Sequence, residues 1–149
     1  MFSKDYVVST KNTSLIFKAE KGEKSIFQYY GSKIDNISDV YNAGLNMNIE
    51  TYPAFGLNNK LEKVVAITQP DGNMSLDLVV DSVEQIKDEN GSKTVIILKD
   101  KIYPVEIKQF FRTYTNTDVI STWVEICNNG KKPITLYQFA SAYLPVYSC

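Results

Sequence analysis

Apolar and polar residues alternate along several segments of this chain, and this period of two limits the fold more than any other feature. Leu76, Leu78 and Val80 alternate with neighbours that include two aspartates, and the same spacing recurs over 103–108 and 120–126. Successive side chains of a β-strand point to opposite faces, so this spacing puts one apolar face on a core and the other in water. A continuous apolar run at 95–98 predicts a strand covered on both faces.

Turn-forming residues separate these segments at intervals of about 8–12 residues, which is typical of a sandwich or barrel. Lys21-Gly22 lies between the segments 15–19 and 25–30 and predicts a hairpin. Asn90-Gly91 suits the positive φ angles of a second hairpin turn. Pro70–Asn73 and Asn128–Gly130 divide the later segments. Helix is limited to at most one turn at 37–41, so the sequence predicts one all-β domain over residues 1–149.

The stretch from Asp35 to Glu62 departs from this rhythm. It is rich in Asn, Gly, Tyr and Pro and lacks clean alternation. A long irregular connection in a compact domain is usually functional, or packs on something outside the domain. This stretch is therefore the first place to look for a site.

The composition argues against most catalytic sites and against nucleic acid as a partner. The chain contains no histidine, which removes Ser-His-Asp and Cys-His nucleophilic sites and zinc sites built on imidazole. The formal net charge is −1, so the surface offers no basic field for nucleic acid or anionic lipid. We expect no catalytic residue, no metal site and no cofactor in this chain.

The two cysteines and the chain ends carry less information. Cys127 and Cys149 form no disulfide framework and show no metal-ligand spacing, so we expect two reduced thiols. No stretch approaches the ~18 apolar residues of a membrane span, and the first residues do not resemble a signal peptide. The last eleven residues, 139–149, are apolar and aromatic, whereas natural termini are more often polar, so we expect polypeptide to follow them.

The order and spacing of several short motifs identify a resemblance that single motifs would not. The chain resembles, over nearly its whole length, the N-terminal domain of glycoside hydrolase family 36 α-galactosidases. The matching motifs are Phe27–Ile34, Tyr52-Pro53-Ala54-Phe55-Gly56, Gln69-Pro70-Asp71-Gly72, Leu98-Lys99-Asp100, Tyr103-Pro104-Val105, Asp118-Val119-Ile120, Asn128-Asn129-Gly130 and Pro133–Leu136.

The resemblance implies a β-supersandwich, that is, two packed and mostly antiparallel sheets, preceding a catalytic (β/α)₈ barrel. Such a barrel needs about 250 residues and carries the catalytic aspartates of a retaining α-galactosidase, so the catalytic pair would lie outside this chain. The implied partners are that downstream barrel, further copies in a homo-oligomer and, for the whole enzyme, a galacto-oligosaccharide substrate. The implied setting is a bacterial cytoplasm or periplasm.

The resemblance also points to one loop. In tetrameric members of the family, the stretch after the Tyr-Pro-x-Phe/Tyr-Gly motif helps to close a neighbouring subunit's active site. The candidate rim or interface residues here are Tyr52, Pro53, Phe55, Gly56, Asn58, Asn59 and Glu62. Many members continue with a Gly-Asp-Phe-Arg-Glu type sequence, whereas this chain has Asn59 at the Asp position and Leu61 at the Arg position. Only Glu62 is kept, which puts a direct sugar contact from this loop in doubt.

Two other functions stay open from the residues alone. Trp123 lies on the opposite strand face from Ile120 and Val124, so its side chain is either exposed or covered by a second layer. We favour a Trp123 that is buried under a second layer or under the barrel that follows. If exposed, it could serve as the aromatic platform of an autonomous carbohydrate-binding module. An open β-barrel around a small apolar ligand is a further alternative. A carboxylate pair at Asp77 and Asp81 is better explained as a solvated strand face.

Overall fold

The computed structural model describes residues 4–56 and 62–144, and almost all of its regular structure is β-strand. The strands and the helix, in chain order, are β1 (Lys4–Ser9), β2 (Thr13–Ala19), β3 (Ile26–Ser32), α1 (Ile37–Asn42), β4 (Ile49–Glu50), β5 (Val65–Thr68), β6 (Leu78–Asp88), β7 (Gly91–Asp100), β8 (Val105–Tyr114), β9 (Ile120–Asn128) and β10 (Thr135–Phe139).

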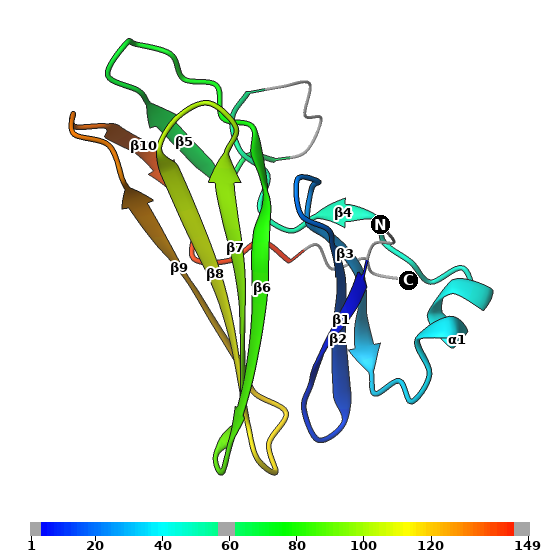
Figure 1. The fold of residues 1–149 in the computed structure, drawn as a ribbon. Helices are drawn as coiled ribbons and strands as arrows, with labels where there is room; N and C mark the ends of the chain where they lie inside the picture. The colour runs from blue at the N-terminus through cyan, green and yellow to red at the C-terminus, as the bar shows by residue number, and fades with distance from the viewer. Residues whose placement is uncertain (1–3, 57–61, 145–149) are drawn as a thin grey trace.

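These strands form two four-stranded antiparallel sheets and one small two-stranded sheet. The first sheet has the order β1-β2-β3-β4 and the second β6-β7-β8-β9, and they face each other across the core (Figure 1). The third pairs β5 with β10 at one end of the molecule. The prediction of an all-β sandwich is confirmed, and so are both predicted hairpins, which appear as β2–β3 and β6–β7.

The predicted alternation is confirmed in the core. Leu78 and Val80 of β6 are buried, as are Val105 and Ile107 of β8. Three aromatic rings join the two large sheets: the Phe111 centroid lies 6.3 Å from that of Phe17 and 6.2 Å from that of Phe27. The sandwich therefore closes around contacts between β8 on one side and β2 and β3 on the other.

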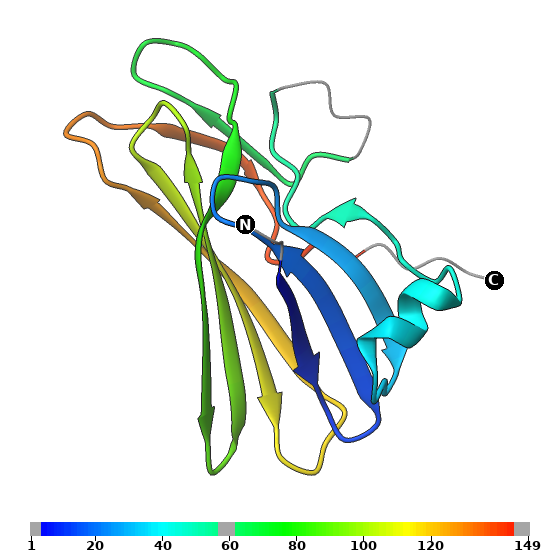
Figure 2. The same cartoon turned by 45° about the vertical axis from the view of Figure 1, so that its right-hand side comes forward.

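The irregular stretch contains one short helix, as the sequence allows. Asn36 begins α1, its side-chain oxygen accepting a hydrogen bond from the Ser38 amide at 3.1 Å. The helix lies at the outer end of the β1–β4 sheet (Figure 2). Within the described ranges, no helix has the length and apolar character that crossing a membrane would require.

The barrel alternative is wrong. Among the described residues, no strand of one large sheet pairs with a strand of the other, so the sheets do not close into a barrel. One cleft between them has a volume of about 120 Å³, and Ala142, Tyr143 and Leu144 form part of its lining. That volume is smaller than the roughly 300 Å³ at which small-molecule sites begin. A larger groove of about 1070 Å³ lies between β1 and the strands β6–β8, but its lining is mostly polar and charged and does not suit a small apolar ligand.

A carboxylate clip ties the two large sheets together at one end. Asp118, in the β8–β9 loop, accepts hydrogen bonds from the Thr10 hydroxyl at 2.8 Å, the Asn12 amide at 2.6 Å and the Asn12 side chain at 2.7 Å. Hydrogen bonds from the Asn12 side chain and backbone, then from Thr10, hold the pKa of Asp118 below its usual value. The β1–β2 hairpin is thereby fixed to the opposite sheet.

We predict that Asp118→Ala lowers the urea midpoint of unfolding at neutral pH. A carboxylate with a depressed native pKa contributes stability above its unfolded pKa of about 3.9 and loses it as the pH falls through the native value. The difference between wild type and variant should therefore shrink as the pH is lowered below about 4. Asp35→Ala, at an exposed carboxylate with no hydrogen bond to a described residue, is the control. A difference that does not change with pH would contradict the clip.

Candidate functional site

The segment Tyr52–Gly56 is held like a short extra strand between two other segments. Backbone hydrogen bonds of 2.9 Å join Val64 to Pro53, Phe55 to Val65 and Leu76 to Phe55. Ala54 and Gly56 form isolated parallel bridges to Val65 and Leu76. Since backbone pairing fixes both sides of the segment, its conformation is set by the sandwich.

Two buried contacts anchor the start of this segment. The Tyr52 side chain is 1% exposed, and its hydroxyl donates to the Ala140 carbonyl at 2.7 Å, just after β10. Burial raises the pKa of Tyr52, which keeps the hydroxyl a neutral donor. Thr51 exchanges two hydrogen bonds with Gln109 of β8, at 2.8 and 3.1 Å. The loop base is therefore connected both to β8 and to the end of β10.

Phe55 is the aromatic residue that this segment presents outward. Its side chain is 39% exposed, and the Lys63 ammonium lies 4.1 Å from the ring centroid. Gly56 follows at φ +153°, and a Cβ at that position would lie 2.8 Å from the Leu76 carbonyl oxygen. Only glycine fits at this position, which directly follows an exposed aromatic ring held beside a cation.

The predicted loop residues have different outcomes. Tyr52 and Pro53 are buried, so their side chains support the loop from inside the domain, and Gly56 is half-buried. Phe55 and Glu62 are exposed on either side of the loop. Asn58 and Asn59 lie outside the described residues. Among the described residues that border the loop, Phe55 and Glu62 are exposed and Lys63 is half-buried.

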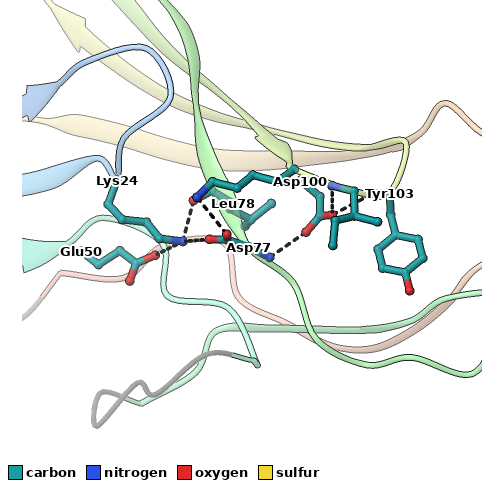
Figure 3. Close-up of polar contacts among 8 residues, drawn as sticks. Lys24, Glu50, Asp77, Leu78, Asp100 and Tyr103 are labelled. Carbon is teal, nitrogen blue, oxygen red and sulfur yellow. Dashed lines mark hydrogen bonds and ion pairs between the residues drawn. The ribbon is translucent and has the colours of Figure 1, made fainter.

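A network of ion pairs lies beside this segment and was not predicted (Figure 3). The Lys24 ammonium contacts Asp77 at 2.9 Å and Glu50 at 3.8 Å, and it donates to the Leu78 carbonyl at 2.7 Å. Lys101 contacts the other oxygen of Asp77 at 3.0 Å. Residues from three loops and from β4 meet here, which no local sequence pattern reveals.

The two carboxylates of this network differ in their pKa. Burial acts to raise the pKa of Asp77, but hydrogen bonds and attraction from Lys24 and Lys101 outweigh it, and the pKa falls below its usual value. Burial raises the pKa of Glu50 despite attraction from Lys24. Opposite shifts can mark an acid and a base, yet here the Lys24 ammonium contacts both carboxylates and pairs with each of them. We interpret the network as a support for the neighbouring loops.

The carboxylates singled out in the sequence are paired with lysines. Asp81 contacts Lys99 at 2.8 Å and Lys21 at 3.7 Å, while Asp77 belongs to the network just described. Hydrogen bonding from Lys99 holds the pKa of Asp81 below its usual value. The interpretation of these two carboxylates as a solvated strand face did not include these ion pairs. Among the described residues, no group of three or more potential ligands could hold a metal ion.

Trp123 lies on the outer face of the β6–β9 sheet. Its ring stacks on Phe110 with the centroids 4.8 Å apart and the planes 2° from parallel, while Ile120 and Val124 pack against the core. The Trp123 side chain is 36% exposed, so no second layer of described residues buries it. Cys127, also on β9, is a free thiol, and Cys149 lies outside the described residues.

Comparisons with known proteins identify the architecture. The search of curated proteins found no match. Among solved structures, the chain is similar to the galactosidase domain of an α-galactosidase–sucrose kinase, AgaSK, with 22% identity and a TM-score of 0.79, covering 93% of this chain and 24% of that one. It is also similar to the family 36 α-galactosidase AgaA from Geobacillus stearothermophilus, with 14% identity, a TM-score of 0.79 and the same coverages.

A third similar structure is the α-galactosidase from Lactobacillus brevis, with 16% identity, a TM-score of 0.74 and coverage of 93% of this chain and 23% of that one. The chain thus spans about a quarter of the length of the solved proteins it matches. The model of the glycosyl hydrolase family 36 N-terminal domain matches residues 23–148, which is most of the sequence. The chain therefore belongs to the glycosyl hydrolase family 36 N-terminal domain family.

Proposed function

We propose that this domain is the non-catalytic N-terminal part of an α-galactosidase and that it packs against a catalytic barrel in the same polypeptide. The observation that carries this proposal is the set of apolar side chains on β10. Tyr137 is 76% exposed, Phe139 64% and Leu136 41%. A soluble protein rarely leaves large apolar side chains clustered on one short strand unless another surface covers them.

The geometry of the small sheet supports the same reading. Among the described strands, β10 pairs with β5 alone, and its register shifts between Leu136 and Gln138, so Tyr137 lies at a β-bulge or similar irregularity. A two-stranded sheet is at best marginally stable alone and needs packing on a neighbour. The similar solved structures are about four times as long as this chain, which leaves room for such a neighbour in the proteins they represent.

The substrate and the loop belong to the same proposal. The α-galactosidase AgaA from Geobacillus stearothermophilus was solved in complex with raffinose. We propose a terminal α-galactoside of that kind as the substrate of the whole enzyme. Phe55 and Glu62, with Asn58 and Asn59 between them, would face a second copy of the enzyme and form the rim of its active site. Support comes from the exposed Phe55 ring and from the backbone pairing that fixes its position.

Enzymatic activity should differ between the chain alone and the chain joined to the proposed barrel. The 149-residue chain should not hydrolyse a nitrophenyl α-galactoside, whereas the longer polypeptide should. Turnover by the chain alone would disprove the accessory role.

In the longer polypeptide, Tyr137→Ser combined with Phe139→Ser should destabilise the protein by about 2–5 kcal/mol, because two buried aromatic contacts are lost. The matched control is Ile86→Ser, at a side chain that is 50% exposed on β6 of another sheet. Equal effects of the double variant on the chain alone and on the longer protein would contradict docking through β10.

A second candidate function rests on Trp123. The exposed, stacked indole could bind the face of a sugar ring, which would make the domain an autonomous carbohydrate-binding module. This candidate predicts that galactose or raffinose changes the Trp fluorescence of the chain with a Kd below ~1 mM, and that Trp123→Ala abolishes binding. Phe110→Leu, which removes the stacking partner and keeps the indole, is the control. Fluorescence that does not change over the titration would exclude the module.

A further inference from the structure

Strand β9 forms an edge of its sheet that no described strand covers. In the order β6-β7-β8-β9 it pairs with β8 alone, and Figure 1 shows it at the margin of the sheet. Within the described ranges, no backbone hydrogen bond joins the other side of Ile120–Cys127 to a further segment. An edge strand presents a row of amides and carbonyls with which another strand can pair, so β9 is a candidate docking edge.

The other edge strands of the two large sheets are protected against such pairing. Strand β4 has only two residues. Strand β1 has six, two of them charged, and its Val7 carbonyl accepts a hydrogen bond from the Gln85 side chain at 3.2 Å. The register of β6 shifts between Val80 and Ser82, and two backbone hydrogen bonds of 2.8 Å join Val80 to the β2–β3 turn. Short length, charge and irregularity are devices by which edge strands avoid pairing.

Strand β9 has none of these devices. It is nine residues long, Glu125 is its only charged residue, and it contains no lysine, proline or glycine. Its register with β8 runs without a shift along its whole length. A long, regular edge with little charge promotes association between molecules if it is left open. We therefore expect another strand to cover it.

The outer face of the sheet offers a contact for the side chains of an added strand. Val95 lies opposite Phe110, and Phe110 lies opposite Trp123, so a row of apolar side chains crosses three strands. Val95 is 5% exposed and Trp123 36%, so the row becomes more open towards the edge. Cross-strand neighbours on one face stabilise a sheet. A side chain from an added strand would extend this row over the open side of the indole.

The inner face of β9 has a matching gap. Ile120 and Thr122 line the cleft of about 120 Å³ together with Leu15 and Tyr30 of the opposite sheet. Tyr30 is 41% exposed, so this side of the sandwich is not closed by the described residues. Successive side chains of a strand point to opposite faces. One added strand would therefore supply side chains both to the outer row and to the cleft.

Two observations favour a strand of the same polypeptide as the occupant. Ala142 and Leu144 line the same cleft as Ile120 and Thr122, so the segment after β10 already lies beside β9. The similar solved structures are about four times as long as this chain. A second copy suits the edge less well, because the inward side chains of its own β9 already face its own cleft. Pairing two copies edge to edge would leave both clefts unfilled.

We propose that a β-strand from outside these 149 residues, in the same longer polypeptide, pairs with the free edge of β9 and places alternate side chains over Trp123 and into the cleft. This inference rests on the longer enzyme proposed above, but it does not depend on docking through β10. It also excludes the carbohydrate-binding module, because the open side of the Trp123 ring then belongs to a contact within the protein.

Hydrogen exchange of the β9 amides at single-residue resolution tests the proposal in the 149-residue chain and in the longer polypeptide. Successive amides of a strand point to opposite edges, so alternate amides of 120–128 should exchange fast in the chain alone. In the longer polypeptide this fast set should slow by about tenfold or more. Amides of β7, which is paired on both sides, are the control and should exchange at the same rate in both. An alternating pattern that persists in the longer polypeptide would overturn the proposal.

Proline substitution gives an independent measurement. Proline has no amide hydrogen, so a sheet tolerates it where the amide points outward from an edge strand, but not where the amide pairs with a neighbour. Proline replaces whichever of Ser121 and Thr122 has the fast amide in the chain alone, and the other position is the matched control. The first variant should lower the Tm of the longer polypeptide and change that of the chain alone little, whereas the control should lower both. Equal effects of the first variant on both proteins would contradict the added strand.

The outcomes also separate this inference from its alternatives. If the longer polypeptide hydrolyses an α-galactoside while alternate β9 amides stay fast, the proposed function stands and the added strand is wrong. If these amides are slow in a longer polypeptide without activity, the added strand stands and the α-galactosidase assignment is wrong. Protection that grows with the concentration of the 149-residue chain, and is absent from a monomeric longer polypeptide, would assign the edge to a second copy and overturn the proposal.

Discussion

The contact of Phe111 with Phe17 and Phe27 is the interaction on which the rest of the structure depends. No strand of one large sheet pairs with a strand of the other among the described residues, so apart from a few loop hydrogen bonds, such as those of Val80 with Gly22 and Glu23 at 2.8 Å, side chains on the facing surfaces hold the sheets together. Replacing a buried phenylalanine by alanine costs about 3–5 kcal/mol. That is a large share of the roughly 5–15 kcal/mol that keeps a domain folded. The Asp118 clip then fixes one end of the same two sheets.

The inner faces of the two large sheets form the core, so the apolar residues that do not lie on these faces are on the outside of the molecule. Strand β10 carries three of them, and β9 carries the Trp123 ring stacked on Phe110. The loop base at 52–56 is attached to both β8 and the end of β10 through Thr51 and Tyr52. A surface that covers β10 would therefore act on the position of Phe55 as well, which links packing on a barrel to the proposed rim of an active site.

The sequence predicted the parts of the fold that depend on local pattern. Alternation placed Leu78, Val80 and Ile107 in the core, and Lys21-Gly22 and Asn90-Gly91 marked real hairpin turns. The single helical turn predicted at 37–41 is present as α1, which Asn36 caps by accepting a hydrogen bond from a free amide of the first turn. The motif order indicated the family, which the family model confirms.

Contacts between distant segments could not be predicted in the same way. Lys24 and Asp77 are far apart in the chain and meet only because the β2–β3 turn packs against the start of β6. Gln69 appeared in the sequence as part of a turn motif, and only the structure shows that its side chain is buried. The strand pattern also could not decide whether another layer covers Trp123. Alternation shows which face of the sheet a residue occupies, but it does not show what lies over that face.

Amide hydrogen exchange of β10 tests most directly whether polypeptide outside these 149 residues covers this strand. The account predicts that the amides of 135–139 exchange at least about tenfold more slowly in the longer polypeptide than in this chain alone, because docking suppresses local opening. Amides of β7, which lies inside the large sheet, should exchange at the same rate in both. Equal rates for β10 in the two proteins would contradict the account.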